Sequence, residues 1–471
     1  MAAHPPPRHT ILDRLLRPLS KVKPGEGLLA VLMLVCVLLI LTSYYVMKTA
    51  REGLILTGGT FGLRGSELKT YANGAMALSL VAVIPAYGAL ANRFRRIRLI
   101  NVSYTIVIAC LLGFYVLAHA GAPIGLAFFS WLGLVSVFLV AQFWSYANDL
   151  YTEEQGKRLF AIIAIGGSLG AVLGPRIAQL ADTFTLMLIA GGLLAACLLL
   201  FNAIEHLEGR HLSGEDIASA PITGSGGFSL VLRDRYLVLI AAMLLVANLV
   251  NTTGEYILSN AAANHAAHVV PATAHPELVG AARDHAITAD RRELIKAFYG
   301  DFFFWVNLVG FLIQAFLVSR VIEKLGVRLA LFALPVIAFG AYAAIGAVGG
   351  LALIRAAKVA ENGTDYSMQN TVRQTLFLPT ARAVKYKAKA AIDTFFVRAG
   401  DTLSAVLVGI GIHELGFGSR QLALANLVLI TLWMAIGAGI AHRHRSMTLE
   451  PAPPAAPPRW VATPAAAGAN A

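Results

Sequence analysis

Charge is scarce in this chain. Asp, Glu, Lys and Arg together make up 14% of its 471 residues, whereas 57% are hydrophobic, and the mean hydropathy is +0.68. A soluble globular protein carries more polar residues than this, and a disordered chain carries far fewer apolar ones. The composition therefore excludes both classes and indicates that the lipid bilayer is the solvent of this protein.

Cysteine is also scarce. The three cysteines, Cys36, Cys110 and Cys197, all lie inside apolar runs, which excludes a disulfide framework and a cysteine metal cluster. Four histidines between positions 265 and 285 are spaced too irregularly for a metal site, so we expect a solvated loop there. No nucleophile is paired with a base in the sequence. We therefore expect no enzymatic activity, no metal and no cofactor.

Long apolar runs are what the chain has in abundance. Such runs predict an all-α integral membrane protein with about twelve transmembrane helices, because about 20 apolar residues suffice for a helix to cross a bilayer. The first run follows a basic segment and lacks a cleavage site, so we expect it to be retained as a span. The runs lie near 28–47, 71–91, 99–118, 123–147, 159–181, 183–203, 236–258, 298–319, 329–349, 350–376, 388–412 and 420–441.

Basic residues cluster between particular runs. If the spans alternate in direction, all the clusters lie on one side, which is the positive-inside pattern. We therefore expect a bacterial inner-membrane protein with both termini in the cytoplasm, and we attribute the net charge of +12 to topology rather than to nucleic-acid binding. The clustered residues are Arg14, Arg17, Lys21 and Lys23; Arg93, Arg95, Arg96 and Arg98; Arg320, Lys324 and Arg328; Lys385, Lys387 and Lys389; and Arg443 and Arg445.

The chain divides into two similar halves. A polar, glycine-rich linker at 206–235 separates six runs from six. An acidic residue stands near the outer end of the first span of each half, Glu52 in one and Glu255 in the other, and both halves have a basic turn after their second span. Two parallel six-span repeats are typical of major-facilitator-type transporters, which bind their solute between the repeats.

These patterns give the expected domain boundaries. We expect two pseudo-symmetric six-helix bundles and three segments outside them. The expected ranges are a basic cytoplasmic tail at 1–26, bundles at 27–205 and 236–441, an extracellular loop at 259–296 within the second bundle, and a disordered tail rich in Pro and Ala at 442–471.

One polar segment interrupts the apolar pattern. At helical spacing its polar residues form a single stripe, and a charge at the bilayer centre costs at least about 2.5 kcal/mol. We expect the stripe to line a water-filled solute pathway. The alternative is a buried network that holds helices together, in which Lys358, Glu361 and Asp365 pair with one another. The stripe consists of Arg355, Lys358, Asn362, Asp365, Gln369 and Arg373.

Two other spans carry charge. Lys48, Arg51 and Glu52 share a face near the end of the first span, where they belong either to the pathway or to an interface that they reach by snorkelling. The charged residues of the eleventh span lie deeper in apolar sequence, so we regard them as better pathway candidates. They are Lys389, Asp393, Arg398 and Asp401.

The glycine-rich stretch 163–174 resembles a phosphate-binding loop in composition. It lacks the Lys-Ser/Thr ending of such loops and lies within an apolar run. We therefore interpret it as tandem small-xxx-small packing against another helix.

Three blocks of sequence resemble a known family, the nucleotide transporter family of ATP/ADP translocases found in plastids and intracellular bacteria. They lie at 45–56, at 143–148 leading to 154–160, and at 387–393 with Arg398 beyond. The resemblance implies a major-facilitator-like fold that exchanges ATP for ADP with phosphate, without hydrolysis. By motif, it also implies a substrate site that includes Lys48, Arg51, Glu52, Asn148, Lys389, Asp393 and Arg398.

Two departures from the family pattern leave the solute open. Asp401 stands where the translocases are expected to have a lysine, and the fourth span has no acidic residue. We expect a monomeric exchanger of a small anionic solute such as ATP or ADP. The alternatives are a proton-coupled transporter of another anionic solute, with Glu52, Asp393 or Asp401 as the proton site, and a non-transporting receptor or scaffold.

Overall fold

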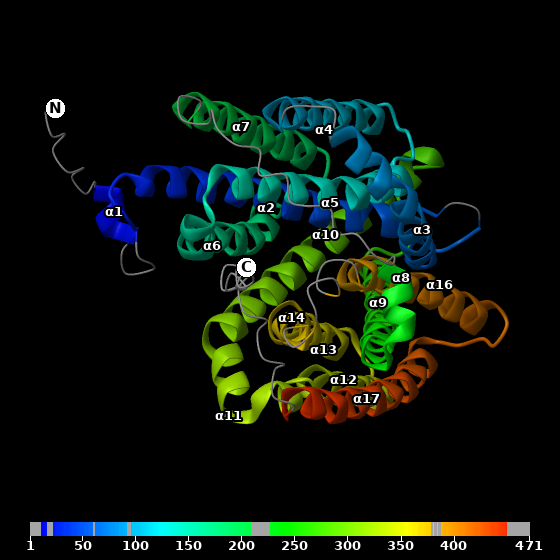
Figure 1. Ribbon diagram of the computed structural model, residues 1–471. Coiled ribbons are helices and arrows are strands. Elements are labelled where there is room, and N and C mark those ends of the chain that lie inside the picture. Colours follow the sequence, from blue (N-terminus) through cyan, green and yellow to red (C-terminus); the bar gives the residue numbers. More distant parts are fainter. Residues whose placement is uncertain are drawn as a thin grey trace, which may run out of the picture.

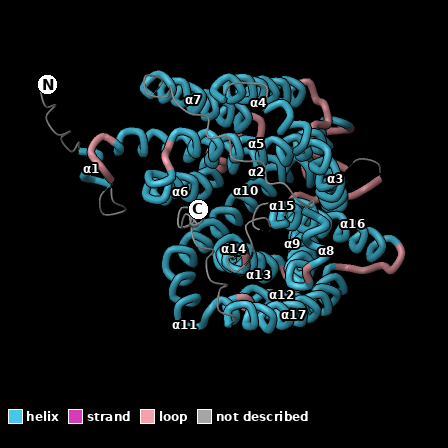
Figure 2. The backbone as a smooth tube through the Cα atoms, in the orientation of Figure 1, coloured by secondary structure: helices cyan, strands magenta, loops and turns pink. Residues whose placement is uncertain are grey.

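The structure, a computed structural model, describes residues 11–16, 22–59, 62–91, 96–208, 227–377 and 388–449, and the single residues 380 and 384. Within these ranges the chain consists of helices and loops only (Figure 2). Most of the expected basic tail, the centre of the linker and the Pro/Ala-rich end of the chain lie outside the described residues, as do six members of the basic clusters. Those six are Arg17, Lys21, Arg93, Arg95, Lys385 and Lys387.

The helices form two groups that follow the chain order (Figure 1). The first bundle contains α2 (Glu26–Thr57), α3 (Gly65–Ala91), α4 (Arg96–His119), α5 (Gly125–Leu150), α6 (Glu153–Ile177) and α7 (Thr185–Glu208). The second contains α9 (Arg235–Val269), α10 (Ala281–Leu312), η1 (Ile313–Leu317), α11 (Val318–Ala330), α12 (Ala333–Ala347), α13 (Leu351–Thr364), η2 (Asp365–Gln369), α14 (Asn370–Leu376), α15 (Lys389–Ala391), η4 (Ile392–Phe396), α16 (Val397–His413) and α17 (Ser419–Leu449). The short helices α1 (Ile11–Leu16) and α8 (Gly227–Arg233) precede the two bundles.

Each bundle has its own hydrophobic core. Phe128, Phe143 and Phe201 are fully buried in the first, and Tyr236 and Phe302 in the second. In the described part of the chain, nine helices are long and apolar enough to span a membrane, and the pair α11 and α12, bent by 73°, would make a tenth. The all-α membrane fold is therefore confirmed, although composition alone supports fewer spans than the expected twelve.

We call the side on which α2 begins and α17 ends the terminal side, and the opposite side the far side. Local signals fix several helix starts on the terminal side. The Thr152 hydroxyl accepts from the backbone N–H of Gln155, and the Gln155 side chain accepts from the backbone N–H of Thr152, which forms a capping box at the start of α6. The Arg158 guanidinium donates two hydrogen bonds of 2.9 Å to Glu26, which ties the starts of α6 and α2 together.

The glycine-rich stretch of α6 packs against α2, as its sequence predicts. A Cβ atom at Gly166, Gly170 or Gly174 would lie within 2.7 Å of an atom of α2. Only glycine permits so close a contact between the two helices. The interpretation as helix packing, rather than as a phosphate loop, is therefore confirmed.

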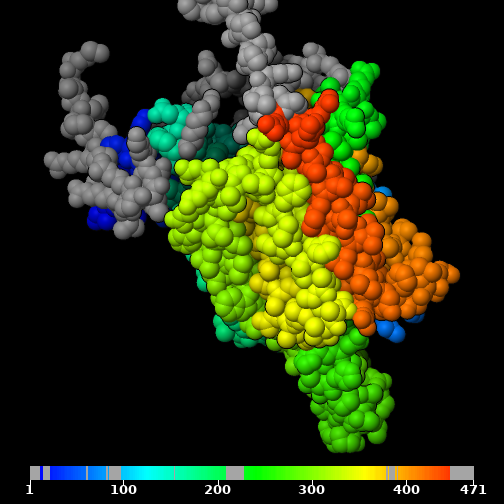
Figure 3. All heavy atoms as spheres, turned by 90° about the horizontal axis from the view of Figure 1, so that it is seen from below, coloured from blue at the N-terminus to red at the C-terminus, as the bar shows by residue number. Residues whose placement is uncertain are grey.

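The expected loop at 259–296 is mostly helical. The helix α9 continues to Val269 and α10 begins at Ala281, so only a short connection is left between them. Figure 3 shows this helical hairpin as the green lobe that projects from the molecule. Hydropathy did not predict this hairpin because it detects only apolar segments. The residues at 259–296 are polar, but many of them still favour helix formation.

In the part of the second bundle that the structure describes, short π-helical segments lie at η1, η2 and η4. Because a π-turn inserts an extra residue, the side chains beyond it point in another direction than regular helical spacing predicts. The stripe expected from Arg355 to Arg373 therefore divides at η2.

A charged cavity between the two bundles

A cavity of about 250 Å³ lies between the bundles, and we call it the central cavity. Four cations and three carboxylates line it together with several amides, all from helices of both halves. The charged residues are Lys48, Arg51 and Glu52 of α2, Lys69 of α3, Glu255 of α9, and Arg398 and Asp401 of α16. Charged groups from the first, seventh and eleventh expected spans thus meet in one place.

Lys48 is the cation in this cavity that has aromatic neighbours rather than an acidic one. Its ammonium nitrogen lies 4.4 Å from the ring centroid of Phe303 and 5.1 Å from that of Tyr45. Within the described residues, no carboxylate lies within 4.0 Å of it. Cation–π contacts offset part of the cost of burying this charge but leave it able to bind an anion.

Lys69 joins two acidic residues from different bundles. Its ammonium lies 2.7 Å from Glu52 and 3.8 Å from Glu255, and all three residues line the cavity. Lys69 also donates to Ser259 over 3.2 Å and lies 5.0 Å from the ring centroid of Tyr299. The Glu52 and Glu255 positions that the repeat pattern pairs therefore meet at a single lysine.

Lys358 belongs to a buried network beside the cavity. Its side chain is 1% exposed and lies 3.0 Å from Glu361 and 3.8 Å from Glu255. It also donates to the side chain of Asn251 over 2.8 Å, and Asn362 donates to Glu255 over 2.9 Å. Lys358 and Glu361 thus form the buried pair that the network interpretation predicts, without Asp365, while Asn362 lines the cavity.

Arg398 and Asp401 face the cavity from α16. The Arg398 guanidinium lies 3.3 Å from Asp401, which also accepts from Asn248 over 2.8 Å and from Thr252 over 2.6 Å. Asp401, the acidic residue that departs from the family pattern, is therefore hydrogen-bonded to α9 and faces the cavity.

The remaining candidate residues lie elsewhere. Asp365 and Arg373 line a separate cavity of about 120 Å³ within the second bundle. Arg373 and Lys389 lie 3.9 Å and 3.7 Å from Asp393.

Three further candidates also lie outside the central cavity. Gln369 is buried, and its amide has no hydrogen-bond partner among the described residues. Arg355 lies 3.3 Å from Asp301. Asn148 is exposed on α5 and lines none of the cavities described here.

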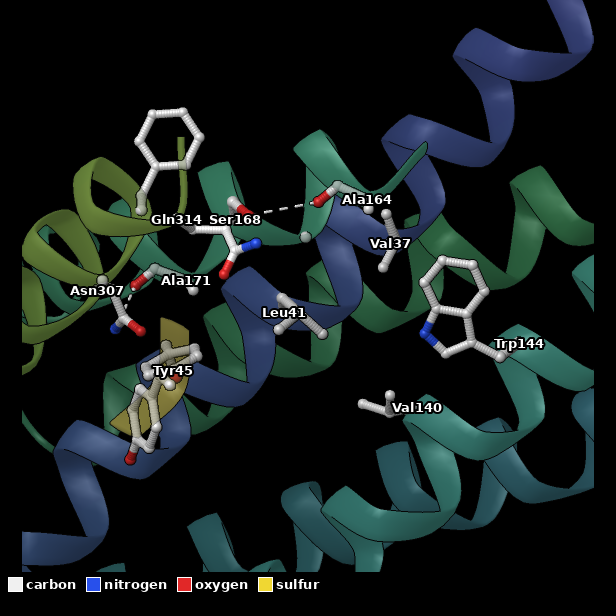
Figure 4. A pocket seen from close by; sticks show the side chains of 14 residues that line it. Val37, Leu41, Tyr45, Val140, Trp144, Ala164, Ser168, Ala171, Asn307 and Gln314 are labelled. Carbon is white, nitrogen blue, oxygen red and sulfur yellow. Dashed lines mark hydrogen bonds between the residues drawn. The ribbon is translucent and has the colours of Figure 1, made fainter. Parts of the chain in front are cut away.

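A second cavity of about 370 Å³ lies next to the central one, toward the terminal side. We call it the terminal-side cavity. Val37, Leu41 and Tyr45 of α2 line it together with Trp144 of α5. Asn307 of α10 and Gln314 of η1 line it from the second bundle (Figure 4), so it also lies between the bundles. Tyr366 of η2 lines both cavities.

On the far side, polar contacts join the bundles. Arg176 of α6 and Asp301 of α10 lie 2.6 Å apart. The hydroxyl of Thr183 donates to Glu293 over 2.7 Å, and Lys296 donates over 2.5 Å to the backbone oxygen of Ala181. Together with the Lys69 cluster, these contacts close the far side of the cavity.

Sequence reasoning missed several cavity residues. Lys69 precedes the second apolar run, so it was not among the expected pathway residues, whereas α3 begins at Gly65 and Lys69 is buried within it. Extending the second predicted helix into the polar residues before the apolar run would have included Lys69. The amides of Asn73, Asn248 and Asn251 line the cavity from within apolar sequence, where single polar residues give no periodic signal.

Comparison with known proteins gives relatives of low identity. The ADP,ATP carrier protein 1 of Chlamydia trachomatis is 23% identical over 351 residues, which cover 64% of this chain and 61% of that protein. The protein of the same name in Chlamydia muridarum is 22% identical over 349 residues, with the same coverage. The match thus spans less than two thirds of the length of these relatives. No protein-family model matches the chain.

Solved structures share the fold. The nucleoside transporter NupG superposes with a TM-score of 0.56 at 12% identity, over 89% of this chain and 99% of that one. A POT family transporter in complex with 5-aminolevulinic acid superposes with a TM-score of 0.59 at 14% identity, over 89% and 96% of the two chains. At these identities the likeness shows the fold alone. The resemblance found in the sequence is therefore confirmed, and the chain is a divergent relative of the bacterial ADP,ATP carrier proteins with a major-facilitator-type fold.

Proposed function

We propose that this protein is a nucleotide antiporter that works as a monomer in the bacterial inner membrane, with both termini in the cytoplasm. The observation that carries the proposal is Lys48, a cation in the inter-bundle cavity with no carboxylate partner among the described residues. A phosphate group there would gain a charge-assisted contact without first breaking an ion pair. The names of the chlamydial relatives support a nucleotide as the solute.

The other cations of the cavity extend this phosphate site. Arg51 lies 3.3 Å from Glu52 and 4.5 Å from the ring centroid of Phe129, so its guanidinium is neutralised on one edge only. Arg398 shares Asp401 with two neutral donors of α9. Two guanidinium groups and one ammonium could together hold a di- or triphosphate.

Exchange follows from the ion pairs between the bundles. In the described structure the far side is closed by contacts such as Lys69 with Glu255 and Arg176 with Asp301. A phosphate in the cavity would compete with the carboxylates for Lys69 and Arg51, and so loosen the closed side. A ligand shifts such an equilibrium only through its different affinities for the two states. We infer that the loaded cavity switches more readily than the empty one.

Nucleotide exchange in proteoliposomes tests the proposal. Vesicles loaded with ADP should take up labelled ATP, and vesicles without internal nucleotide should not. We expect Lys48→Gln and Arg398→Ala to abolish exchange while the variants still insert and purify normally. Lys324→Gln, which removes an exposed cation of α11, is the matched control and should keep exchange. Normal exchange by Lys48→Gln would contradict the proposal.

Asp401 favours one alternative. It places a carboxylate on the cavity wall, as a proton-coupled transporter of another anionic solute would require. In that case uptake into the same vesicles would depend on a pH gradient and ignore internal nucleotide, and Asp401→Asn would remove the dependence on pH while leaving binding intact.

A further inference from the structure

Another cavity lies between the bundles on the far side, and we call it the far-side cavity. Its volume of about 480 Å³ falls within the range of about 300–1,000 Å³ that is usual for small-molecule sites. The end of α2 and the connection between α4 and α5 line it from the first bundle, and one face of α10 lines it from the second. It shares no described lining residue with the central cavity. The far-side cavity is therefore separate from the proposed phosphate site.

The wall that α10 contributes is the polar one. Its lining residues are Asp284, His285, Thr288, Ala289 and Arg292. They recur at spacings of three and four residues, so they form one face of the helix over about two turns. This face belongs to the first turns of α10, which have no part in the proposed function.

Arg292 is the cation of this cavity. Among the described residues no carboxylate lies within 4.0 Å of it, and its buried Nε atom has no hydrogen-bond partner. The guanidinium carbon lies 5.0 Å from the ring centroid of Phe184. The rest of the side chain packs on α2 at Gly53, where a Cβ atom would lie 3.0 Å from the Arg292 Cγ atom. A half-buried guanidinium without an acidic partner is costly, and an anion in the cavity would supply the missing acceptor.

The start of α5 adds to the positive potential. Gly125 and Leu126, in the first turn of α5, line the cavity, and this helix has no side-chain cap. The first N–H groups of a helix have no acceptor within it, and the peptide dipoles place partial positive charge there. A guanidinium and a helix start on the walls of one cavity together favour an anionic group.

The other walls restrict what the anion can be. Most side chains from the first bundle are apolar, such as Leu54, Leu68 and Phe184. Asp284 is exposed, lines the same cavity and has no cation within 4.0 Å among the described residues. Its carboxylate would repel a second negative charge on the ligand. The lining thus suits one anionic group on an apolar body better than it suits a polyphosphate.

We propose that the far-side cavity is a second ligand site, which takes a monoanionic organic acid with an apolar body, and that its occupancy holds the far side closed. The carboxylate accepts from Arg292, and the body packs against Phe184 and Leu54. Because the lining comes from both bundles, the site is complete only while they meet on the far side. A ligand that binds one state more tightly shifts the equilibrium toward that state. This inference does not depend on the identity of the transported solute.

Three probes with the same carbon skeleton test the site. They are phenylpropionate, the neutral phenylpropanol and the cationic phenylpropylamine. Binding to the protein in nanodiscs is measured by ligand-observed NMR, with the signal of empty nanodiscs subtracted. We expect the acid to bind at least about tenfold more tightly than the other two, in line with a hydrogen bond to a charged group. Arg292→Gln should remove this preference, and Arg292→Lys should keep part of it.

Two further variants make the test specific. Arg291→Gln is the matched control, because Arg291 precedes Arg292 on α10 but donates to the backbone oxygen of Val270 over 2.9 Å and should bind all three probes as wild type does. Ala289→Leu keeps Arg292, fills the cavity from its α10 wall and should weaken all three probes, so it decides the matter if Arg292→Gln does not fold. A preference for the acid that survives Arg292→Gln, or that Arg291→Gln removes equally, would overturn the site. Wild-type binding by Ala289→Leu would do the same.

Cross-linking tests the closure. The hydroxyl of Thr183 and the carboxylate of Glu293 touch across the bundles in the closed state. Cysteines at these two positions, in a background without the native cysteines, should react faster with a short bifunctional thiol reagent when phenylpropionate is present. Arg292→Gln should remove this acceleration. An unchanged or slower reaction would show that occupancy does not hold the far side closed.

Competition separates this site from the central cavity. Excess ATP should leave the binding of phenylpropionate unchanged, because the two ligands occupy different cavities. Displacement of the acid by ATP would place it in the central cavity and contradict the proposal. If the protein binds no nucleotide at all, the proposed function fails, whereas the Arg292 and Ala289 variants still decide the far-side site.

Discussion

At the scale of single residues, burial decides what each charge can do. Lys48 and Lys358 are both lysines within apolar helices, yet their surroundings differ. Lys48 has aromatic rings around it and lines a cavity, whereas Lys358 is almost fully buried against Glu361. An ammonium that lines a cavity next to aromatic rings remains available to a ligand, but one already matched to a buried carboxylate is part of the packing.

Lys358→Met is expected to destabilise the protein. The substitution leaves Glu361 buried without its cation, and breaking a buried ion pair on one side costs about 3–5 kcal/mol. Thermal unfolding of the purified protein in one detergent, at one pH and salt concentration, should show a lower midpoint. The double variant Lys358→Met with Glu361→Gln should recover part of the loss, because Tyr342 can still bond to the amide in place of the carboxylate. An unchanged midpoint in the single variant would show that the pair is not structural.

At the scale of helices, the two bundles differ: the first contains a closely packed helix pair, and the second contains helices with π-turns. The α2 and α6 helices meet through glycines and form a closely packed pair within the first bundle. The second bundle instead has π-turns, among its described residues at η1, η2 and η4. Tyr366 lies in η2, at the boundary between the two cavities. The cavity wall from the first bundle thus includes a closely packed helix pair, whereas the wall from the second bundle includes irregular helices.

Gly170→Leu should disrupt the α2 and α6 pair. A Cβ atom at this position would lie 2.5 Å from the backbone oxygen of Leu38, so the helices must separate at a cost of about 1–3 kcal/mol, as for other overpacked sites. Gly192→Leu is the matched control, since a Cβ there has no heavy atom within 4 Å. The two variants are compared by yield of monodisperse protein and by thermal unfolding. Equal behaviour would mean that α2 can move away from α6 freely.

At the scale of the whole molecule, the bundles are joined on the far side by few but charged contacts. Lys69 lies between Glu52 of its own bundle and Glu255 of the other. Without the lysine, two carboxylates face each other across the interface and repel. Replacing one side of a buried charge cluster typically costs about 3–5 kcal/mol, which is close to the 5.5 kcal/mol that reverses a 99:1 equilibrium.

Lys69→Met should therefore open the far side. Spin labels at Ala120 and Glu414, which are exposed on the far side of the first and second bundle, report the separation of the bundles in a background without the three native cysteines. Pulsed electron paramagnetic resonance should show a longer-distance population in the variant. Lys324→Met is the control. Identical distance distributions in all three proteins would exclude a role for Lys69 in holding the bundles together.

The sequence predicts the membrane class, the two halves and most of the charged cavity. These succeed because apolar runs and repeated acidic positions such as Glu52 and Glu255 are local signals of lipid contact and of symmetry. Lys69 was missed because hydropathy measures contact with lipid and cannot distinguish a surface lysine from one buried between helices. Gln369 and Arg373 were placed on one stripe with Lys358 because regular spacing cannot anticipate the π-turn at η2.

The hairpin of α9 and α10 has one more consequence. With 35 residues, α9 is roughly 50 Å long at 1.5 Å per residue, well beyond the hydrocarbon thickness of about 30 Å, and Figure 3 shows the hairpin standing clear of the other helices. It belongs to the second bundle alone. An antibody fragment raised against its tip would therefore travel with that bundle, and would mark its orientation in single-particle images.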